Sequence, residues 1–183
     1  MELLSHMEQE TIAEVGNISL GAAASALSSI INRRVDITTP HVEVLTVNRV
    51  KQNFPVPCLL VETGYLSGLK GDNILLIKQE DALAIAGLMI GAQGDSLGEM
   101  ELSAIQEAMN QMMGFMATSM SEMFGQVIEI TPPRLTRCNL AEQDLNCLEK
   151  EELVVQVSFS VLVEGVIDSK LIQVIPLEFA KQM

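Results

Sequence analysis

The sequence predicts an α+β fold made of two copies of one unit, related by a pseudo-two-fold axis. Three observations on the 183-residue chain support this prediction. A stretch near the N-terminus recurs in the second half, each copy opens with a long helix-like segment, and short turns join the strands that follow. Because strands joined by short turns run antiparallel, we expect a largely antiparallel sheet with two long equivalent helices packed on it.

The repeat aligns Glu10 to Pro40 with Ser103 to Pro133 without a gap, at an offset of 93 residues. The two copies share identical residues at Ile12 and Ile105, Glu14 and Glu107, Asn17 and Asn110, Gly21 and Gly114, Ala24 and Ala117, Ser28 and Ser121, Ile37 and Ile130, Thr38 and Thr131, and Pro40 and Pro133. The downstream segments correspond after a shift of a few residues. We therefore expect one domain of two repeats, at about residues 7–92 and 100–183.

A short strand should follow each long helix and end at Thr-x-Pro in the first half and at Thr-Pro-Pro in the second. Later segments alternate or run apolar as strands do, at residues 42–47, 58–66, 73–78, 153–163 and 170–175. Turns rich in Gly, Asp, Asn and Ser lie at 68–73 and 164–169. A further helix is predicted over 80–91, and residues 91–100 should link the halves.

Polar groups and small residues share one stripe of each long helix when residues are placed at 100° steps. The stripe consists of Glu14, Asn17, Gly21, Ala24, Ser25 and Ser28 in the first copy and of Ser103, Glu107, Asn110, Gly114, Ala117 and Ser121 in the second. A solvated helix face is the ordinary explanation, but such faces normally carry long side chains. Small residues leave room for another surface, so we expect a partner-docking face at Gly21, Ser28, Ser103, Gly114 and Ser121.

The remaining arc of each helix should pack on the sheet. It carries Ile12, Val15, Ile18, Leu20, Leu27 and Ile30 in the first copy and Met109, Met112, Met113, Met116, Met120 and Met123 in the second. A methionine stripe also fits a promiscuous binding groove or a copper site. Its place opposite the polar stripe favours core filling, because methionine fills irregular gaps well.

Charge and composition exclude several functions. A formal net charge of −13 with no basic stripe argues against a nucleic-acid partner. Charged or amide residues interrupt the apolar runs before they reach membrane-spanning length, and the N-terminus lacks signal-peptide features, so we expect a soluble cytoplasmic chain. The three cysteines, Cys58, Cys138 and Cys147, lack zinc-site spacing and are expected to be free thiols.

The paired Glu and Asn side chains suggest a chemistry of positioning. An asparagine amide does not titrate near neutral pH, but it donates and accepts hydrogen bonds and can orient a water molecule, as phosphoryl transfer requires. The carboxylate could receive a cation from a partner. The sequence offers no glycine-rich phosphate loop, no carboxylate cluster for Mg²⁺ and no basic residue in the stripe. The metal, the cation and the phosphoryl group would therefore come from the substrate.

These residues resemble the motif of the CheC, CheX and FliY family of chemotaxis phosphatases. The family pattern begins with Asp or Ser and continues with Glu, Asn and a distant Pro. It occurs here as Ser103, Glu107, Asn110 and Pro133. It recurs as Glu14, Asn17 and Pro40, with Glu10 departing from the pattern in first place. Residues 4–28 and 167–183 look closer to the FliY branch, whose members are flagellar switch proteins, than to CheC.

The resemblance implies a phosphatase that acts on the aspartyl phosphate of the response regulator CheY at the cytoplasmic face of the flagellar basal body. Glu14, Asn17, Glu107 and Asn110 would be its catalytic residues, with the Asn orienting water and the Glu pairing with a CheY lysine. No cofactor or metal is expected in this chain, because CheY would hold the Mg²⁺. FliM-, FliN- and FliG-type switch proteins would be further partners. The chain would match the middle domain of FliY, without its N-terminal CheY-binding segment and FliN-like C-terminal domain.

Two other readings remain open at this point. A non-catalytic adaptor domain of the switch would use the Glu and Asn only to dock a partner. A CheC-type regulator of a deamidase is the third possibility. The Asn present in both copies favours catalysis, since docking alone rarely needs an amide at that place.

Overall fold

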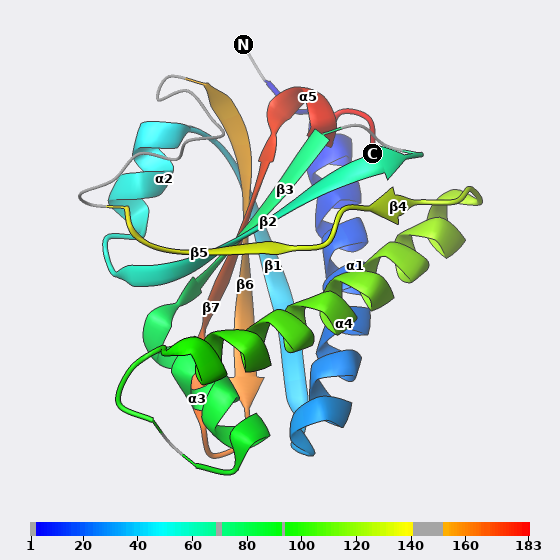
Figure 1. Ribbon diagram of the computed structural model, residues 1–183. Coiled ribbons are helices and arrows are strands. Elements are labelled where there is room, and N and C mark those ends of the chain that lie inside the picture. The colour runs from blue at the N-terminus through cyan, green and yellow to red at the C-terminus, as the bar shows by residue number, and fades with distance from the viewer. Residues whose placement is uncertain (1–2, 69–70, 93, 141–151) are drawn as a thin grey trace.

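A strongly twisted antiparallel sheet crosses the molecule, and two long helices lie across it (Figure 1). The computed structural model describes residues 3–68, 71–92, 94–140 and 152–183. In chain order the elements are α1 (His6–Ile31), β1 (Val35–Thr46), α2 (Val47–Asn53), β2 (Pro57–Ser67), β3 (Gly71–Lys78), α3 (Gln79–Ile90), α4 (Glu99–Phe124), β4 (Glu129–Ile130), β5 (Arg134–Asn139), β6 (Leu153–Val163), β7 (Ile167–Pro176) and α5 (Leu177–Ala180).

The two halves of the chain exchange strands. The sheet order is β1-β6-β7-β3-β2-β4, β5 also pairs with β2, and the described pairings are all antiparallel. The first strand of each half therefore pairs with the second strand of the other half. When each strand is replaced by its counterpart in the other half, the strand order is the same read from either edge of the sheet. The pseudo-two-fold axis therefore passes between β3 and β7. The predicted fold class is confirmed.

The proline motif affects the two halves differently. β1 continues through Pro40 to Thr46, with a register shift between Thr38 and His41. Its counterpart is broken at residues 131–133 into β4 and β5. Proline has no backbone N–H to donate to a neighbouring strand. The single Pro40 is tolerated at an irregularity of the pairing, whereas two prolines in succession interrupt the strand. The expected strand end at the motif is correct for the second half and wrong for the first.

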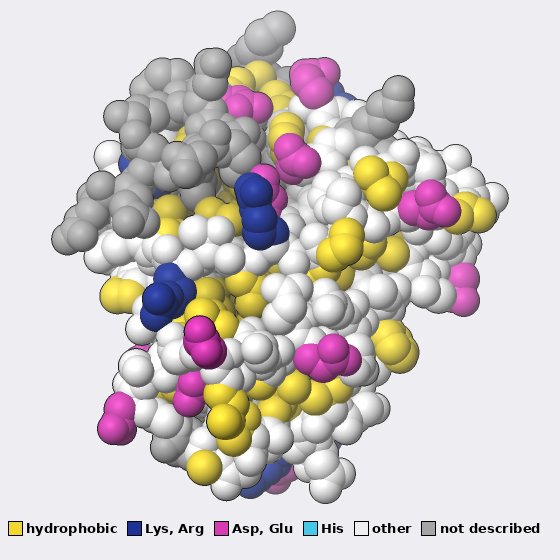
Figure 2. Space-filling model, in the orientation of Figure 1, with side chains coloured by type: hydrophobic (Ala, Val, Ile, Leu, Met, Phe, Trp, Pro, Cys, Tyr) yellow, Lys and Arg dark blue, Asp and Glu magenta, His cyan; other side chains and the backbone are white. Residues whose placement is uncertain are grey.

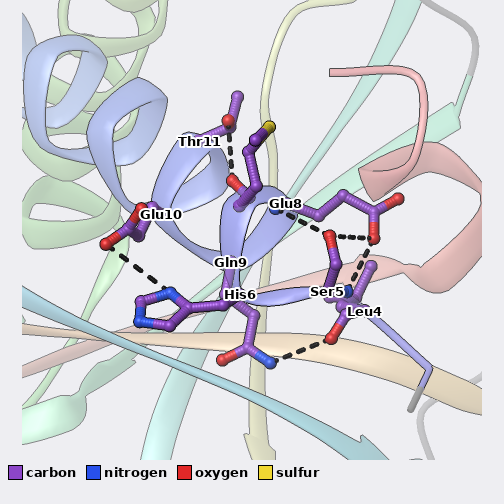
Figure 3. A network of polar contacts seen from close by, with 8 residues as sticks. Leu4, Ser5, His6, Glu8, Gln9, Glu10 and Thr11 are labelled. Carbon is purple, nitrogen blue, oxygen red and sulfur yellow. Dashed lines mark hydrogen bonds and ion pairs between the residues drawn. The ribbon is translucent and has the colours of Figure 1, made fainter.

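Both long helices have defined ends. Ser5 caps α1 through a capping box with Glu8, drawn in Figure 3, and the backbone N–H of Ser5 donates to Glu8 Oε2 at 2.7 Å. This bond lowers the pKa of the Glu8 carboxyl group. At the other end, Asn32 after α1 and Gly125 after α4 adopt left-handed conformations that end each helix.

The helices α1, α3 and α4 cover one face of the sheet, and α4 crosses α1 (Figure 1). Residues Leu59 and Leu75 face this main core, while their neighbours Leu60 and Leu76 belong to a second cluster with α2, because side chains alternate along a strand. The methionines fill the main core as predicted: Met109, Met112, Met113, Met116 and Met120 are at most 3% exposed, and Met123 packs against them. Among the apolar residues predicted for α1, Ile18 is an error, because it is 41% exposed.

Gly16 brings α1 close to the sheet. A Cβ atom at this position would lie 2.9 Å from Cζ of Phe159 on β6 and 3.9 Å from Cγ1 of Val157. Phe159 is only 1% exposed, so its ring has little room to move away. The same helix carries Gly21, where an added Cβ would meet no heavy atom within 4 Å. A side chain would therefore clash with the core at Gly16 but would find open space at Gly21.

We expect Gly16→Ala to destabilise the protein and Gly21→Ala to stabilise it. Both changes gain up to about 1 kcal/mol of helix propensity. At Gly16 the added methyl overpacks the core, which costs about 1–3 kcal/mol. Urea unfolding of the two variants measures the difference. A Gly16→Ala protein at least as stable as the wild type would show that the helix can move off Phe159.

Candidate functional site

Two Glu and Asn pairs stand on the solvent side of the crossed helices. Glu14 and Asn17 on α1 are exposed, and so are Glu107 and Asn110 on α4. A spacing of three residues places both members of a pair on one face of a continuous helix. The pseudo-two-fold axis of the fold relates one pair to the other.

Glutamines hold the second pair. The side-chain nitrogen Nε2 of Gln106 donates to Asn110 Oδ1 at 3.1 Å and to the backbone carbonyl of Pro133 at 2.7 Å. One turn further along α4, Gln111 Nε2 donates to Glu107 Oε1 at 2.8 Å. The Gln106 contact joins Asn110 to Pro133, the last residue of the sequence motif.

The residues on both sides of Pro133 are bonded to β2. On one side of it, Thr131 exchanges two hydrogen bonds with Gly64: the Thr131 N–H donates to the Gly64 carbonyl at 2.8 Å, and the Gly64 N–H donates to Thr131 Oγ1 at 2.9 Å. On the other side, Arg134 forms an ion pair with Glu62 at 2.7 Å. The broken strand is thus anchored on both sides of the carbonyl that Gln106 uses.

The first pair lacks this support. The residues of α1 that correspond to the two glutamines at the offset of 93 are Ala13 and Ile18, neither of which can donate a side-chain hydrogen bond. Within the described residues, neither Glu14 nor Asn17 has a side-chain hydrogen bond. Glu10, which departs from the family pattern, points toward His6, with 3.5 Å between Oε1 and Nδ1 (Figure 3).

The stripe predicted as a partner-docking face is open at its glycines. Gly114, like Gly21, has no heavy atom within 4 Å of an added Cβ, and Ser103 is exposed. The stripe is narrower than predicted, however, because Ala24 and Ala117 are buried at 4% and 7% exposure. The small side chains of these alanines therefore serve close packing within the molecule and not the approach of a partner.

The two serines at the ends of the stripe bond to their own chain. Ser28 Oγ donates to the Arg33 carbonyl at 2.6 Å, beyond the end of α1. Ser121 Oγ donates to the Ala117 carbonyl at 2.8 Å and accepts the Ile128 N–H at 2.9 Å. Both hydroxyls tie the last turn of a helix to the segment that leads into the next strand. Their part in docking a partner stays a prediction.

Sequence reasoning missed four residues of this surface. Gln106 and Gln111 lie off the repeated pattern, so the comparison of the two halves could not find them. Ile18 and Phe115 are large apolar residues on the exposed face, at 41% and 52% exposure, and they lie next to Asn17 and Gly114 in the sequence. The helical wheel contained a signal for Ile18, which lies at about 80°, close to the polar stripe.

The chain is acidic as a whole, and among the described residues on the face that carries α4 the Lys and Arg side chains are few and separated (Figure 2). In the described residues no group of three or more His, Cys, Asp and Glu side chains is placed to hold a metal ion. None of the described helices combines the length and apolar character needed to cross a membrane.

The cysteines lie away from the Glu and Asn pairs. Cys58 and Cys138 face each other across β2 and β5, with 3.3 Å between their sulfur atoms, in the cluster on the opposite face of the sheet from α1 and α4. The contact between the sulfurs raises the pKa of Cys58 and lowers the pKa of Cys138. Cys147 lies outside the described residues.

Comparison with known proteins finds FliY in both sequence and structure. The chain is 46% identical over 185 residues to the flagellar motor switch phosphatase FliY of Bacillus subtilis (strain 168), covering 98% of this chain and 49% of that protein. The chain therefore spans about half the length of this relative. The crystal structure of Thermotoga maritima FliY superposes with a TM-score of 0.91 at 37% identity, covering 99% of this chain and 96% of that one.

The fold extends beyond FliY. The FliM middle domain from H. pylori superposes with a TM-score of 0.77 at 15% identity, covering 98% of this chain and all of that one, a likeness of fold alone. The CheC-like family profile matches residues 7–44 and 100–137, two stretches that begin 93 residues apart and contain the two Glu and Asn pairs. This double match, together with the identity to FliY over nearly the whole length of this chain, shows that the chain belongs to the CheC-like family.

Proposed function

We propose that this protein hydrolyses the aspartyl phosphate of the response regulator CheY at the flagellar motor switch. Asn17 and Asn110 orient the attacking water, and Glu14 and Glu107 dock the partner. The observation that carries the proposal is the repeated Glu and Asn pair, exposed at equal spacing on two symmetry-related helices with open glycines beside it. The name of the Bacillus subtilis relative, a flagellar motor switch phosphatase, supports it.

The chemistry of the pairs fits a division of labour between protein and substrate. Phosphoryl transfer depends mainly on positioning and on stabilising negative charge. A carboxamide supplies the positioning, because it can accept from a water molecule and donate to a phosphoryl oxygen. The substrate's own acidic pocket would supply Mg²⁺, and its lysine would pair with Glu14 or Glu107.

The exposed position of the pairs suits a protein substrate better than a small molecule. Small phosphoesters are usually bound in concave pockets that bury most of the ligand. Here the amides stand on exposed helices, and the neighbouring glycines leave space for another chain to approach. Ile18 and Phe115 add exposed apolar area to this surface. A folded partner that brings its phosphorylated residue to the helices meets these conditions.

A non-catalytic role at the switch is the second candidate, and the FliM-like fold is the observation that favours it. The same fold occurs in switch proteins and in CheC-like proteins, so the fold does not decide between the two functions. In either case we expect FliM-, FliN- and FliG-type switch proteins as partners and a location at the cytoplasmic face of the flagellar basal body. An adaptor would bind phosphorylated CheY without speeding its dephosphorylation.

Replacing both amides, Asn17→Ala with Asn110→Ala, should return the decay of phosphorylated CheY to the rate of CheY alone, because no group would orient the water. The fold should persist, with an unfolding free energy within about 0.5 kcal/mol of the wild type, since both side chains are exposed. The decay is followed by loss of the phosphoryl group over time. Asn53→Ala, at an exposed asparagine that ends α2, is the matched control and should keep full activity. Wild-type decay rates in the double variant would refute the role of the amides.

The paired change Glu14→Gln with Glu107→Gln should raise KM and leave kcat nearly unchanged. Glutamine keeps the size of the side chain and an oxygen that can accept from Gln111, but it loses the charge-assisted bond to a lysine. The loss of binding should be about 1–3 kcal/mol if the ion pair is desolvated and less if it stays wet. Steady-state rates against CheY concentration separate the two constants, with Glu122→Gln on α4 as the control. A fall in kcat at constant KM would make the carboxylates the catalytic groups.

A further inference from the structure

We propose that Gln106 is a positioning residue, which holds the Asn110 carboxamide in its working orientation and makes the second site the faster of the two. This inference rests on the proposed function, because it concerns how well each amide holds water. Its basis is one side-chain nitrogen that donates to both Asn110 and the Pro133 carbonyl.

The contact determines which way the amides face. A backbone carbonyl can only accept, so Gln106 must turn its NH₂ group toward Pro133. The same nitrogen lies 3.1 Å from Asn110, which must therefore present its oxygen to Gln106. Asn110 then keeps both N–H donors and one lone pair of Oδ1 for other partners. These are the groups that a bound water and a phosphoryl oxygen need.

The orientation is supported by the rigid part of the fold. Pro133 lies between two anchors on β2, Thr131 with Gly64 and Arg134 with Glu62. Its carbonyl is thus held in place relative to the sheet, and Gln106 transmits that position to an exposed side chain on α4. An exposed Asn without such a contact exchanges between several rotamers, and this freedom must be lost before the reaction.

The first site has no equivalent contact. Ala13 replaces Gln106, and Asn17 has no side-chain hydrogen bond within the described residues. Asn17 must therefore be ordered during each encounter with the substrate. The glutamine on Glu107 is also absent from the first site, where Ile18 stands in place of Gln111. The repeat keeps the Glu and Asn in both copies but supports them in only one.

The test uses the full chain with Asn17→Ala, which leaves the second site alone to act. In this background Gln106→Met keeps the length of the side chain and removes its donor. We expect kcat for the decay of phosphorylated CheY to fall roughly 10-fold, as it does for other groups that orient a functional side chain, with KM unchanged. Gln106→Ala should behave similarly. An unchanged kcat, or a rise in KM instead, would overturn the proposal.

Gln126→Met is the matched control. Gln126 also donates to a backbone carbonyl, that of Gly68 at 3.3 Å, but it lies beyond the C-terminal end of α4. Its replacement should leave kcat unchanged. The single variants complete the comparison: the chain that retains only Asn110 should have a higher kcat than the chain that retains only Asn17. The reverse order would contradict the assignment of the faster site.

A second measurement does not depend on activity. In the wild-type chain, NMR relaxation of the side-chain NH₂ groups should show the Asn110 carboxamide more ordered than that of Asn17, and Gln106→Met should remove the difference. Equal mobility in the wild type would overturn the positioning role. If the chain does not accelerate the decay of phosphorylated CheY but the difference in mobility is present, the proposed function fails and the contact itself stands.

Discussion

The exchange of strands between the two halves is the constraint on which the rest of the structure depends. β1 pairs with β6 along most of its length, and β5 pairs with β2 in the same way. Neither half can close its part of the sheet alone, because each would leave an edge that the other now fills. The exchange also brings α1 and α4 together on one face, where their polar stripes turn outward. The site is therefore a property of the whole sheet and not of one repeat.

Each of the two helices has one side packed in the core and one side open to solvent. Their inner sides hold methionine, leucine and alanine in the core, and at Gly16 the backbone of α1 approaches Phe159 so closely that a side chain would overpack it. Their outer sides carry Gly21 and Gly114, where an added Cβ would meet no heavy atom within 4 Å. On the same helix, one glycine therefore allows close approach to the core and another leaves the outer surface open. Only the neighbouring atoms distinguish the two cases.

Symmetry supplies two sites, and the departures from symmetry make them different. The double proline of the second half interrupts its strand and leaves the Pro133 carbonyl free to accept from Gln106. The single proline of the first half lies inside a continuous strand. A duplicated fold can thus retain one chemical motif twice while the supporting contacts diverge. The FliM middle domain has the same fold at 15% identity, so the fold does not by itself give the function of this chain, which must be argued from its Glu and Asn pairs.

The sequence alone determined the duplication, the antiparallel sheet, the methionine core and the position of Glu14, Asn17, Glu107 and Asn110 on exposed helix faces, because these follow from periodicity and from residues repeated at a constant offset. It misplaced Ala24 and Ala117, whose burial depends on how the helices pack in the fold, which a helical wheel does not contain. It also misplaced Ile18, although the wheel puts that residue close to the exposed polar stripe. It also could not show that β1 passes through Pro40, since the register of the partner strand decides whether a lost donor is tolerated. The contact from Gln106 to Pro133 joins α4 to the segment between β4 and β5. Only the tertiary structure brings them together, because the position of that carbonyl is set by strands that pair across the two halves.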